Sequence, residues 1–248
     1  MASTTSDFSF KRVLAELPRG EPLSTAALAE HGVSAFRASA LARSGWTVHL
    51  ARGAYMLPGD TLTRDGCLAF LSKQVPGFHV GGKTALEWRG VRQNVSFREV
   101  LVLWGDAPKQ LPKWFTERFD AHYQATQLFD AKMKKDVGLQ PLPNGRAEVL
   151  VSVPERALLE LLSDVGKTQS LDEARQLVET MRSLRDKVLD ELLQHTKRIK
   201  VVRLAEAFAK EFDLPWAKLA TRHSQRLGGG KRWVTVAKTG ERIDLKRS

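Results

Sequence analysis

The chain has 248 residues, is 42% hydrophobic, and carries 39 Lys and Arg against 28 Asp and Glu, a formal net charge of +11. Its length suits one large or two ordinary globular domains with cores of their own. The single cysteine, Cys67, excludes an internal disulfide, and its apolar neighbours indicate a core residue. We expect no metal, since the six histidines show no ligand spacing. Without a signal-peptide pattern or a membrane-spanning apolar stretch, we expect a cytoplasmic protein with no membrane partner.

The positive charge is concentrated near the end of the chain. Residues 195–248 hold 14 Lys and Arg against five Asp and Glu, whereas residues 1–60 hold six against five. Such a basic block favours an anionic partner, with nucleic acid as the first candidate.

The first sixty residues predict a pair of helices joined by a tight turn. An amphipathic helix over 8–17 comes first, and a short helix begins near Ser24. Gly32 supplies the turn, and Ser34 is a good N-cap for a second helix over 35–44. Two short helices around a glycine turn are the pattern of a helix-turn-helix.

A predicted hairpin follows this helix pair directly. Residues 47–50 and 54–57 read as strands, and Ala51, Arg52 and Gly53 form the turn between them. A helix pair followed by a hairpin with a basic tip is typical of a winged helix-turn-helix that reads duplex DNA.

The second helix of the pair would enter the major groove. On a helical wheel Phe36, Ala40 and Leu41 cluster and are expected to face the core. The opposite face would then lie against the bases, while the wing would contact phosphate or the minor groove. The expected DNA contacts are Ser34, Ala35, Arg37, Ala38, Ser39, Arg43, His49 and Arg52.

The rest of the chain mixes helices and strands without regular alternation. Helices are expected over 61–73, 80–88, 154–163, 171–181, 185–196 and 200–212. Strands are expected over 100–104, 119–123, 149–153, 233–236 and 242–245, the last two as a hairpin. We expect most of the acidic residues of the C-terminal helices to lie on the surface. The predicted fold class is α+β, with a winged helix-turn-helix over 1–60 and a larger mixed α/β domain over 61–248.

One motif points to a different chemistry. Residues Gly77 to Thr84 match the phosphate-loop pattern of nucleotide hydrolases, in which Lys83 would contact the phosphates. That pattern needs a buried strand ending at its first glycine, and the residues before Gly77 read as a helix. We therefore expect Lys83 to be structural and the protein to use no cofactor.

Three segments resemble the AbiEi-type antitoxins. Gly45 to Pro58 is similar to their wing, and Val151 to Leu161 is similar to the strand-to-helix passage of their central domain. The tail, Leu227 to Arg232 followed by Gly240 to Asp244, is similar as well. The order of these motifs along residues 8 to 248 is more distinctive than any one of them.

The resemblance implies the non-enzymatic antitoxin of a type IV toxin–antitoxin pair, of the kind used in abortive phage infection. Its N-terminal domain would bind inverted repeats in double-stranded DNA upstream of its own operon and repress it. Its C-terminal domain would counteract a cognate nucleotidyltransferase-like toxin, with or without direct contact. Because residues 1–60 are nearly neutral, we expect the basic C-terminal domain to add phosphate contacts on the nucleoid, through Arg222, Arg226, Lys231 and Arg232.

Two alternatives stay open at this point. The second domain could sense a ligand in an ordinary transcription regulator, or the phosphate-loop pattern could belong to a nucleotide-binding enzyme. A toxin gene beside this one would distinguish the antitoxin from the regulator, and ATP binding would identify the enzyme.

Overall fold

The computed structural model describes residues 12–91, 99–227, 233–236 and 242–245. The chain forms two compact units, the first from residues 1–76 and 110–119 and the second from residues 77–109 and 120–248. Each unit is described by itself. The first unit runs past residue 60, where the sequence analysis places a domain boundary. That residues 1–60 and 61–248 are separate domains stays a prediction.

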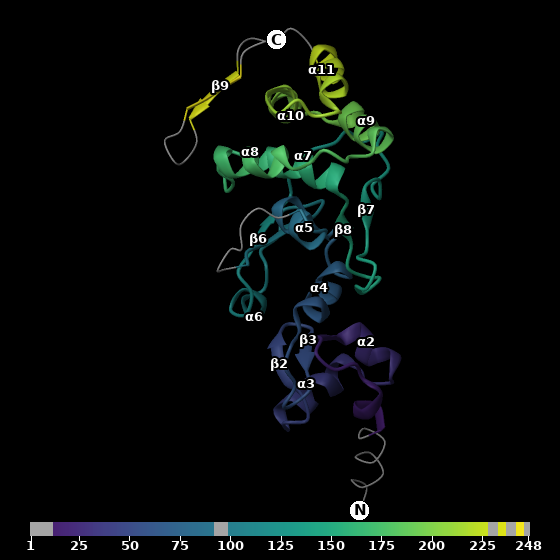
Figure 1. Ribbon diagram of the computed structural model, residues 1–248. Helices are drawn as coiled ribbons and strands as arrows, with labels where there is room; N and C mark the ends of the chain where they lie inside the picture. Colours follow the sequence, from purple (N-terminus) through teal and green to yellow (C-terminus); the bar gives the residue numbers. More distant parts are fainter. Residues whose placement is uncertain (1–11, 92–98, 228–232, 237–241, 246–248) are drawn as a thin grey trace, which may run out of the picture. The chain divides into compact units, whose positions relative to one another are not determined.

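The first unit opens with a helical turn over 12–16 and continues with the predicted helix pair and hairpin (Figure 1). Its elements are β1 (Leu23–Ser24), α2 (Thr25–Glu30), α3 (Ala35–Arg43), β2 (Val48–Ala51), β3 (Ala54–Met56), α4 (Arg64–Ser72) and α6 (Lys113–Thr116). The three strands form an antiparallel sheet in the order β1-β3-β2.

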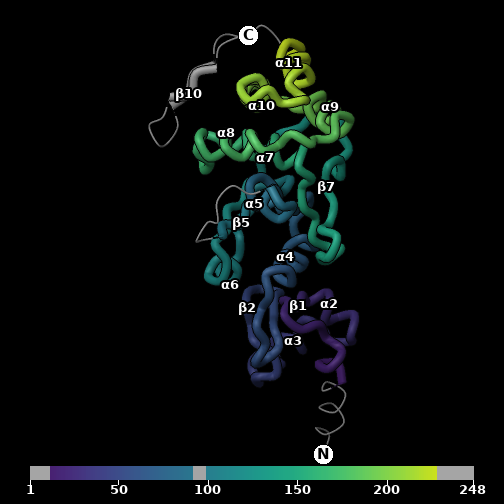
Figure 2. The backbone as a smooth tube through the Cα atoms, viewed as in Figure 1, coloured from purple at the N-terminus to yellow at the C-terminus, as the bar shows by residue number. Residues whose placement is uncertain are grey.

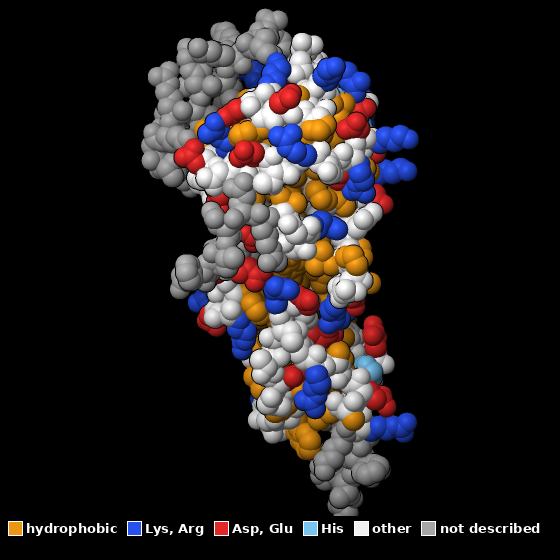
Figure 3. All heavy atoms as spheres, in the orientation of Figure 1, with side chains coloured by type: hydrophobic (Ala, Val, Ile, Leu, Met, Phe, Trp, Pro, Cys, Tyr) orange, Lys and Arg blue, Asp and Glu red, His pale blue; other side chains and the backbone are white. Residues whose placement is uncertain are grey.

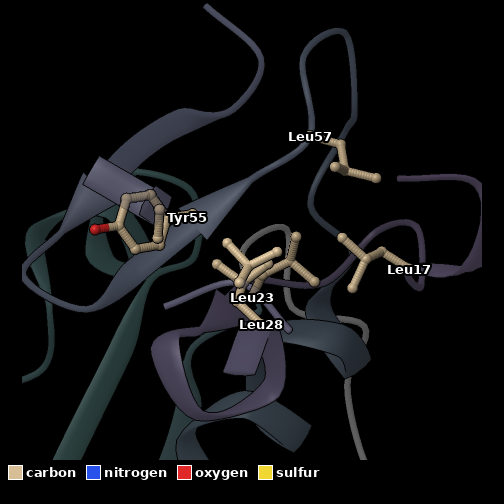
Figure 4. Packing of buried hydrophobic residues seen from close by; sticks show 7 residues of the cluster. Leu17, Leu23, Leu28, Tyr55 and Leu57 are labelled. Carbon is tan, nitrogen blue, oxygen red and sulfur yellow. The ribbon is translucent and has the colours of Figure 1, made fainter. Parts of the chain in front are cut away.

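Apolar side chains from β1, α2, α3, β3 and the segments beside them form the core of the helix-turn-helix. Leu17, Leu23, Leu28, Tyr55 and Leu57 are all buried and converge in Figure 4. Each Å² of apolar surface that is buried stabilises the folded state by about 25 cal/mol. The burial of this cluster is therefore the main interaction that holds the helix pair against the sheet.

Helix α4 is fastened to the loop before β1. The Gly20 amide donates to Asp60 Oδ2 at 2.8 Å, and the Gly20 carbonyl accepts from the Thr63 amide at 2.8 Å. A Cβ on Gly66 would lie 2.3 Å from that same carbonyl oxygen, so only glycine allows this approach. Further along the helix, the ring of Phe70 packs edge to face against the ring of Trp114 in α6, with 5.8 Å between the ring centres. This contact links residues 110–119 to the first unit.

The second unit holds the remaining elements, and Figure 2 follows the chain through them. They are β4 (His79–Val80), α5 (Gly82–Trp88), β5 (Leu101–Trp104), β6 (Ala121–Gln124), β7 (Leu139–Gln140), β8 (Val151–Ser152), α7 (Pro154–Asp164), α8 (Leu171–Glu179), α9 (Asp186–His195), α10 (Ile199–Glu211), α11 (Ala217–Arg226), β9 (Trp233–Val236) and β10 (Arg242–Leu245).

A mixed five-stranded sheet in the order β6-β5-β4-β8-β7 forms one layer of this unit. Helix α5 packs on β5 and β8, and α7 packs on α5. Within the unit, α7 and α8 lie between α5 and the group α9–α11 (Figure 1). Strands β9 and β10 pair antiparallel, as the sequence predicts for the last hairpin. The fold class is therefore the predicted α+β.

One sequence prediction about the second unit is wrong. Val80 does not begin a helix: it lies in β4, where it pairs with Leu103 of β5 and Val151 of β8, and α5 begins at Gly82. Most acidic residues of the later helices are exposed or partly exposed, as the sequence predicts, but Glu155, Glu160, Asp164 and Glu206 are buried. In the part of the chain that the structure describes, no helix is long and apolar enough to cross a bilayer.

Candidate nucleic-acid interface

Serine caps set the boundaries of the two helices of the motif. Ser24 Oγ accepts from the Ala27 amide at 2.9 Å, and Ser34 Oγ accepts from the Arg37 amide at 3.3 Å. Each cap satisfies an amide that has no partner within its own helix. The turn between them passes through Gly32 at φ +76°, as the sequence predicts. The Ser34 hydroxyl is thus already engaged in shaping α3.

The predicted faces of α3 are wrong for Phe36, Ala38 and Ala42, whereas Leu41 faces the core as predicted. Ala38 is completely buried, with Leu41 and Ala42 beside it against the core, whereas Phe36 is 79% exposed. Positions 38, 41 and 42 lie on one face of a helix, and the small side chains of Ala38 and Ala42 let α3 approach the core closely. Ala38 therefore cannot contact DNA, and the outer face contains Phe36 and Arg43.

The outer face of α3 is joined to the wing by a polar contact. Ser39 Oγ lies 3.3 Å from the Tyr55 hydroxyl and also donates to the Ala35 carbonyl at 3.2 Å. The Tyr55 ring in turn meets His49 of β2 edge to face at 5.5 Å. Ser39 and His49 are exposed, so Tyr55 places two of the predicted contact residues on one continuous surface of the unit.

The wing tip carries the predicted arginine. Arg52 is exposed in the turn between β2 and β3, and Gly53 follows it with φ +75°. The Gly53 carbonyl accepts from the Thr25 amide at 3.2 Å, which fastens the tip to the start of α2. The tip therefore presents Arg52 from a held turn.

The charge of this surface differs from that of residues 1–60 as a whole. No Asp or Glu occurs between Glu30 and Asp60, whereas Arg37, Arg43 and Arg52 all fall in that interval and all are exposed. The near-neutral charge of residues 1–60 therefore hides a segment of formal charge +3 that spans α3 and the wing. Such a segment suits a polyanion.

The four auxiliary residues expected to contact phosphates lie in or beyond α11. Arg222 donates to Asp190 Oδ1 at 2.5 Å, and Arg226 donates to the Gln194 carbonyl at 2.8 Å. These bonds hold α11 on α9. Lys231 and Arg232 lie outside the described residues. On the face shown in Figure 3, Lys and Arg side chains are mixed with Asp and Glu and do not gather into one patch.

The residues of the phosphate-loop pattern have other partners. Strand β4 falls inside the pattern instead of before it. Thr84 Oγ1 donates to the Val100 carbonyl and accepts from the Val102 amide, both at 2.9 Å, which leaves no role for it on a metal ion. Lys83 Nζ is paired with Glu173 and lies 3.7 Å from Glu87. These contacts agree with a structural Lys83.

A helix pair with a three-stranded wing is a winged helix-turn-helix, the class of fold that many transcription regulators use on duplex DNA. The family described as "Transcriptional regulator, AbiEi antitoxin N-terminal domain" matches residues 6–97. The family described as "Transcriptional regulator, AbiEi antitoxin, Type IV TA system" matches residues 98–246. The chain therefore belongs to the AbiEi antitoxin family of transcriptional regulators, as its motifs indicate.

The chain resembles a solved structure over most of its length. The crystal structure of the RV2827C protein from Mycobacterium tuberculosis aligns with 92% of this chain and 81% of its own, at a TM-score of 0.54 and 15% identity. At that identity the likeness concerns the fold alone. No curated protein matches this sequence.

Proposed function

We propose that this protein is a non-enzymatic, DNA-binding antitoxin that acts in the cytoplasm on its own operon. Helix α3 and the wing bind inverted repeats upstream of the operon and repress it, and the second unit counteracts a cognate nucleotidyltransferase-like toxin. The observation that carries the proposal is the acid-free surface of α3 and the wing in a chain of the AbiEi family.

The residues of this surface have distinct roles in the proposal. Arg43 and Arg52 contact phosphates, since both are exposed. Phe36, which the helical wheel assigned to the core, lies on the outer face in the first turn of α3, where the helix meets the bases. Phenylalanine makes apolar contacts with thymine methyl groups, so Phe36 adds base readout to the predicted set.

A mobility-shift assay on a duplex that carries the upstream repeats tests the DNA-binding part. Arg43→Ala with Arg52→Ala should weaken binding and reduce the slope of log affinity against log salt by about two units, one for each lost phosphate contact. Phe36→Ala should weaken binding to the repeats more than binding to an unrelated duplex. Arg64→Ala controls for the loss of a positive charge from the same unit, because α4 lies at the other end of the first unit from α3 (Figure 1). A double variant that binds the repeats as wild type does would show that the surface is assigned wrongly.

Co-expression with the product of the neighbouring gene tests the antitoxin part. The Arg43→Ala, Arg52→Ala variant should lose repression of a promoter reporter but still protect cells, because the second unit is unchanged. Protection that disappears together with repression would refute the division of labour. Growth without the antitoxin that equals growth with it would refute the toxin assignment.

A further inference from the structure

The second unit carries exposed cations on two segments of the chain that lie side by side. Residues 131–135 hold three lysines, and residues 197–198 hold a lysine and an arginine, with no acid in either segment. An antiparallel bridge between Phe129 and Thr196 joins the two segments at their start. We call these five exposed cations the basic rim: Lys132, Lys134, Lys135, Lys197 and Arg198.

Most of the basic rim has no acidic partner. Among the described residues, only Lys135 of the five is paired with an acid, Asp106, at 2.6 Å. Asp130, the acid that precedes the first segment, is already bonded to the His195 ring at 2.9 Å and accepts from the Lys132 amide at 2.9 Å. The basic rim therefore leaves four positive charges available to a polyanion.

The two segments of the basic rim meet at a cavity of about 370 Å³, which Lys135 and Lys197 both line. That volume falls within the range of small-molecule sites, about 300 to 1,000 Å³. Leu128, Phe129 and Met133 supply the apolar part of its wall. The cavity can therefore take a ring from a ligand whose charged groups stay on the basic rim.

The polar groups of the cavity wall favour an uncharged ring. Each carboxylate in the lining is already paired with a basic residue. Thr126 and Gln127 also line the cavity, and in the part of the chain that the structure describes their side chains form no hydrogen bond. A hydroxyl and a carboxamide can each donate and accept. These two side chains therefore suit the edge of a nucleobase, which presents donors and acceptors side by side.

We infer that the second unit binds single-stranded RNA here, with phosphates on the basic rim and one unpaired base in the cavity. Proteins that hold single strands combine a cationic surface for the backbone with apolar and aromatic side chains for the bases, and both lie together at this place. Duplex DNA would have to break a base pair before a base could enter, whereas the loops and ends of RNA offer unpaired bases. The inference goes beyond the proposed function and stands whether or not the first unit binds DNA.

Fluorescence anisotropy with a labelled single-stranded RNA of about 12 nucleotides tests the site. The protein is the full chain with Arg43→Ala and Arg52→Ala, so that the wing does not contribute. We expect a dissociation constant on the order of 10 µM or tighter at low salt, and at least about tenfold weaker binding of the same sequence as a blunt RNA duplex.

Lysine variants test the basic rim. Lys132→Gln with Lys197→Gln should weaken the single strand about tenfold and reduce the slope of log affinity against log salt by about 1.4 units, about 0.7 for each lost phosphate contact. Lys187→Gln with Lys218→Gln is the matched control and should change neither quantity, since both are exposed lysines of the second unit outside the basic rim.

Ala131→Leu tests the cavity. Ala131 is exposed and lines the cavity, so a larger side chain there narrows the space for a base without entering the core. The variant should weaken the single strand at least about fivefold and leave the blunt duplex unchanged.

Several results would overturn the inference. They are no binding of the single strand below about 100 µM, equal binding of strand and duplex, or an affinity that the two lysine changes or Ala131→Leu leave unchanged in variants whose circular dichroism matches wild type. Poly-L-glutamate that displaces the RNA as well as unlabelled RNA does would assign the surface to an acidic protein instead. Ultraviolet crosslinking in cells should give adducts of the Arg43→Ala, Arg52→Ala chain that ribonuclease removes, and adducts that only deoxyribonuclease removes would overturn the choice of RNA.

Discussion

Replacement of Glu160 by glutamine should destabilise the second unit by about 3 to 4 kcal/mol. Burial alone would raise the pKa of Glu160, but the charges and hydrogen bonds of His79 and Arg156 outweigh it and lower the pKa from 4.5 to about 2. At about 1.36 kcal/mol per pKa unit, this shift favours the ionised form by about 3 kcal/mol at neutral pH. Removing one partner of a buried ion pair typically destabilises a protein by about 3 to 5 kcal/mol, and this range agrees with the value from the pKa shift.

The structure explains why glutamine is a poor substitute. All four groups around the carboxylate donate to it: His79, Arg156, Ser152 and the Gly82 amide. A glutamine side chain would turn its own NH₂ toward two of these donors and would leave a buried cation without its counter-ion.

Hydrogen exchange of the α7 amides measures this loss in the second unit alone, since it reports the opening free energy of each region. Glu160→Gln should speed exchange by more than about a hundredfold at pH 7. The pKa of Glu160 is lowered in the folded state, so its stabilising contribution is complete above 4.5 and is lost as the pH falls toward 2. Glu211→Gln, which breaks an exposed pair with Arg175, is the control and should change the opening free energy by less than about 1 kcal/mol. If Glu160→Gln also changed the opening free energy by less than about 1 kcal/mol, the assigned role of Glu160 would be refuted.

Three further predictions concern other parts of the structure. Gly66→Ala should destabilise the first unit by about 1 to 3 kcal/mol in a thermal melt, because its Cβ would meet the Gly20 carbonyl; an unchanged midpoint would mean that α4 does not hold this position. Asp164→Asn should raise the melting temperature at pH 7.5 but not at pH 4, because burial raises the pKa of Asp164 to about 6 and its ionisation opposes folding above that pH. Lys83→Ala should leave binding to the upstream repeats unchanged, and wild type should give no saturable heat with Mg-ATP; micromolar binding that Lys83→Ala abolishes would favour the enzyme instead.

Local signals in the sequence predicted most of the element boundaries. Ser24, Ser34 and Ser170 all act as N-caps in the structure, and Pro154 opens α7. These signals work because a cap bonds to an amide only three residues away, so nothing distant in the chain decides them. Helix α11 was not predicted, because its buried face consists of Ala220, His223 and Ser224 and lacks large apolar residues.

Faces and partners could not be read from the sequence in the same way. Helix α3 has apolar residues on both sides, and the core selects small Ala38 over large Phe36 because of the close approach to the sheet. Arg156 and Glu160 have the i,i+4 spacing of an ordinary surface ion pair. They are buried because α7 packs on α5 and because His79 of β4, which bonds to Glu160, comes from a distant part of the chain.

The basic surface of the first unit and the buried charges of the second therefore differ in how far the sequence could reveal them. The basic surface of α3 and the wing was visible, because its arginines and the absence of acids lie within one continuous segment from Glu30 to Asp60. The buried network around Glu160 was hidden, because two of its donors, His79 and the Gly82 amide, lie about 80 residues earlier in the chain and only the folded sheet brings them beside α7.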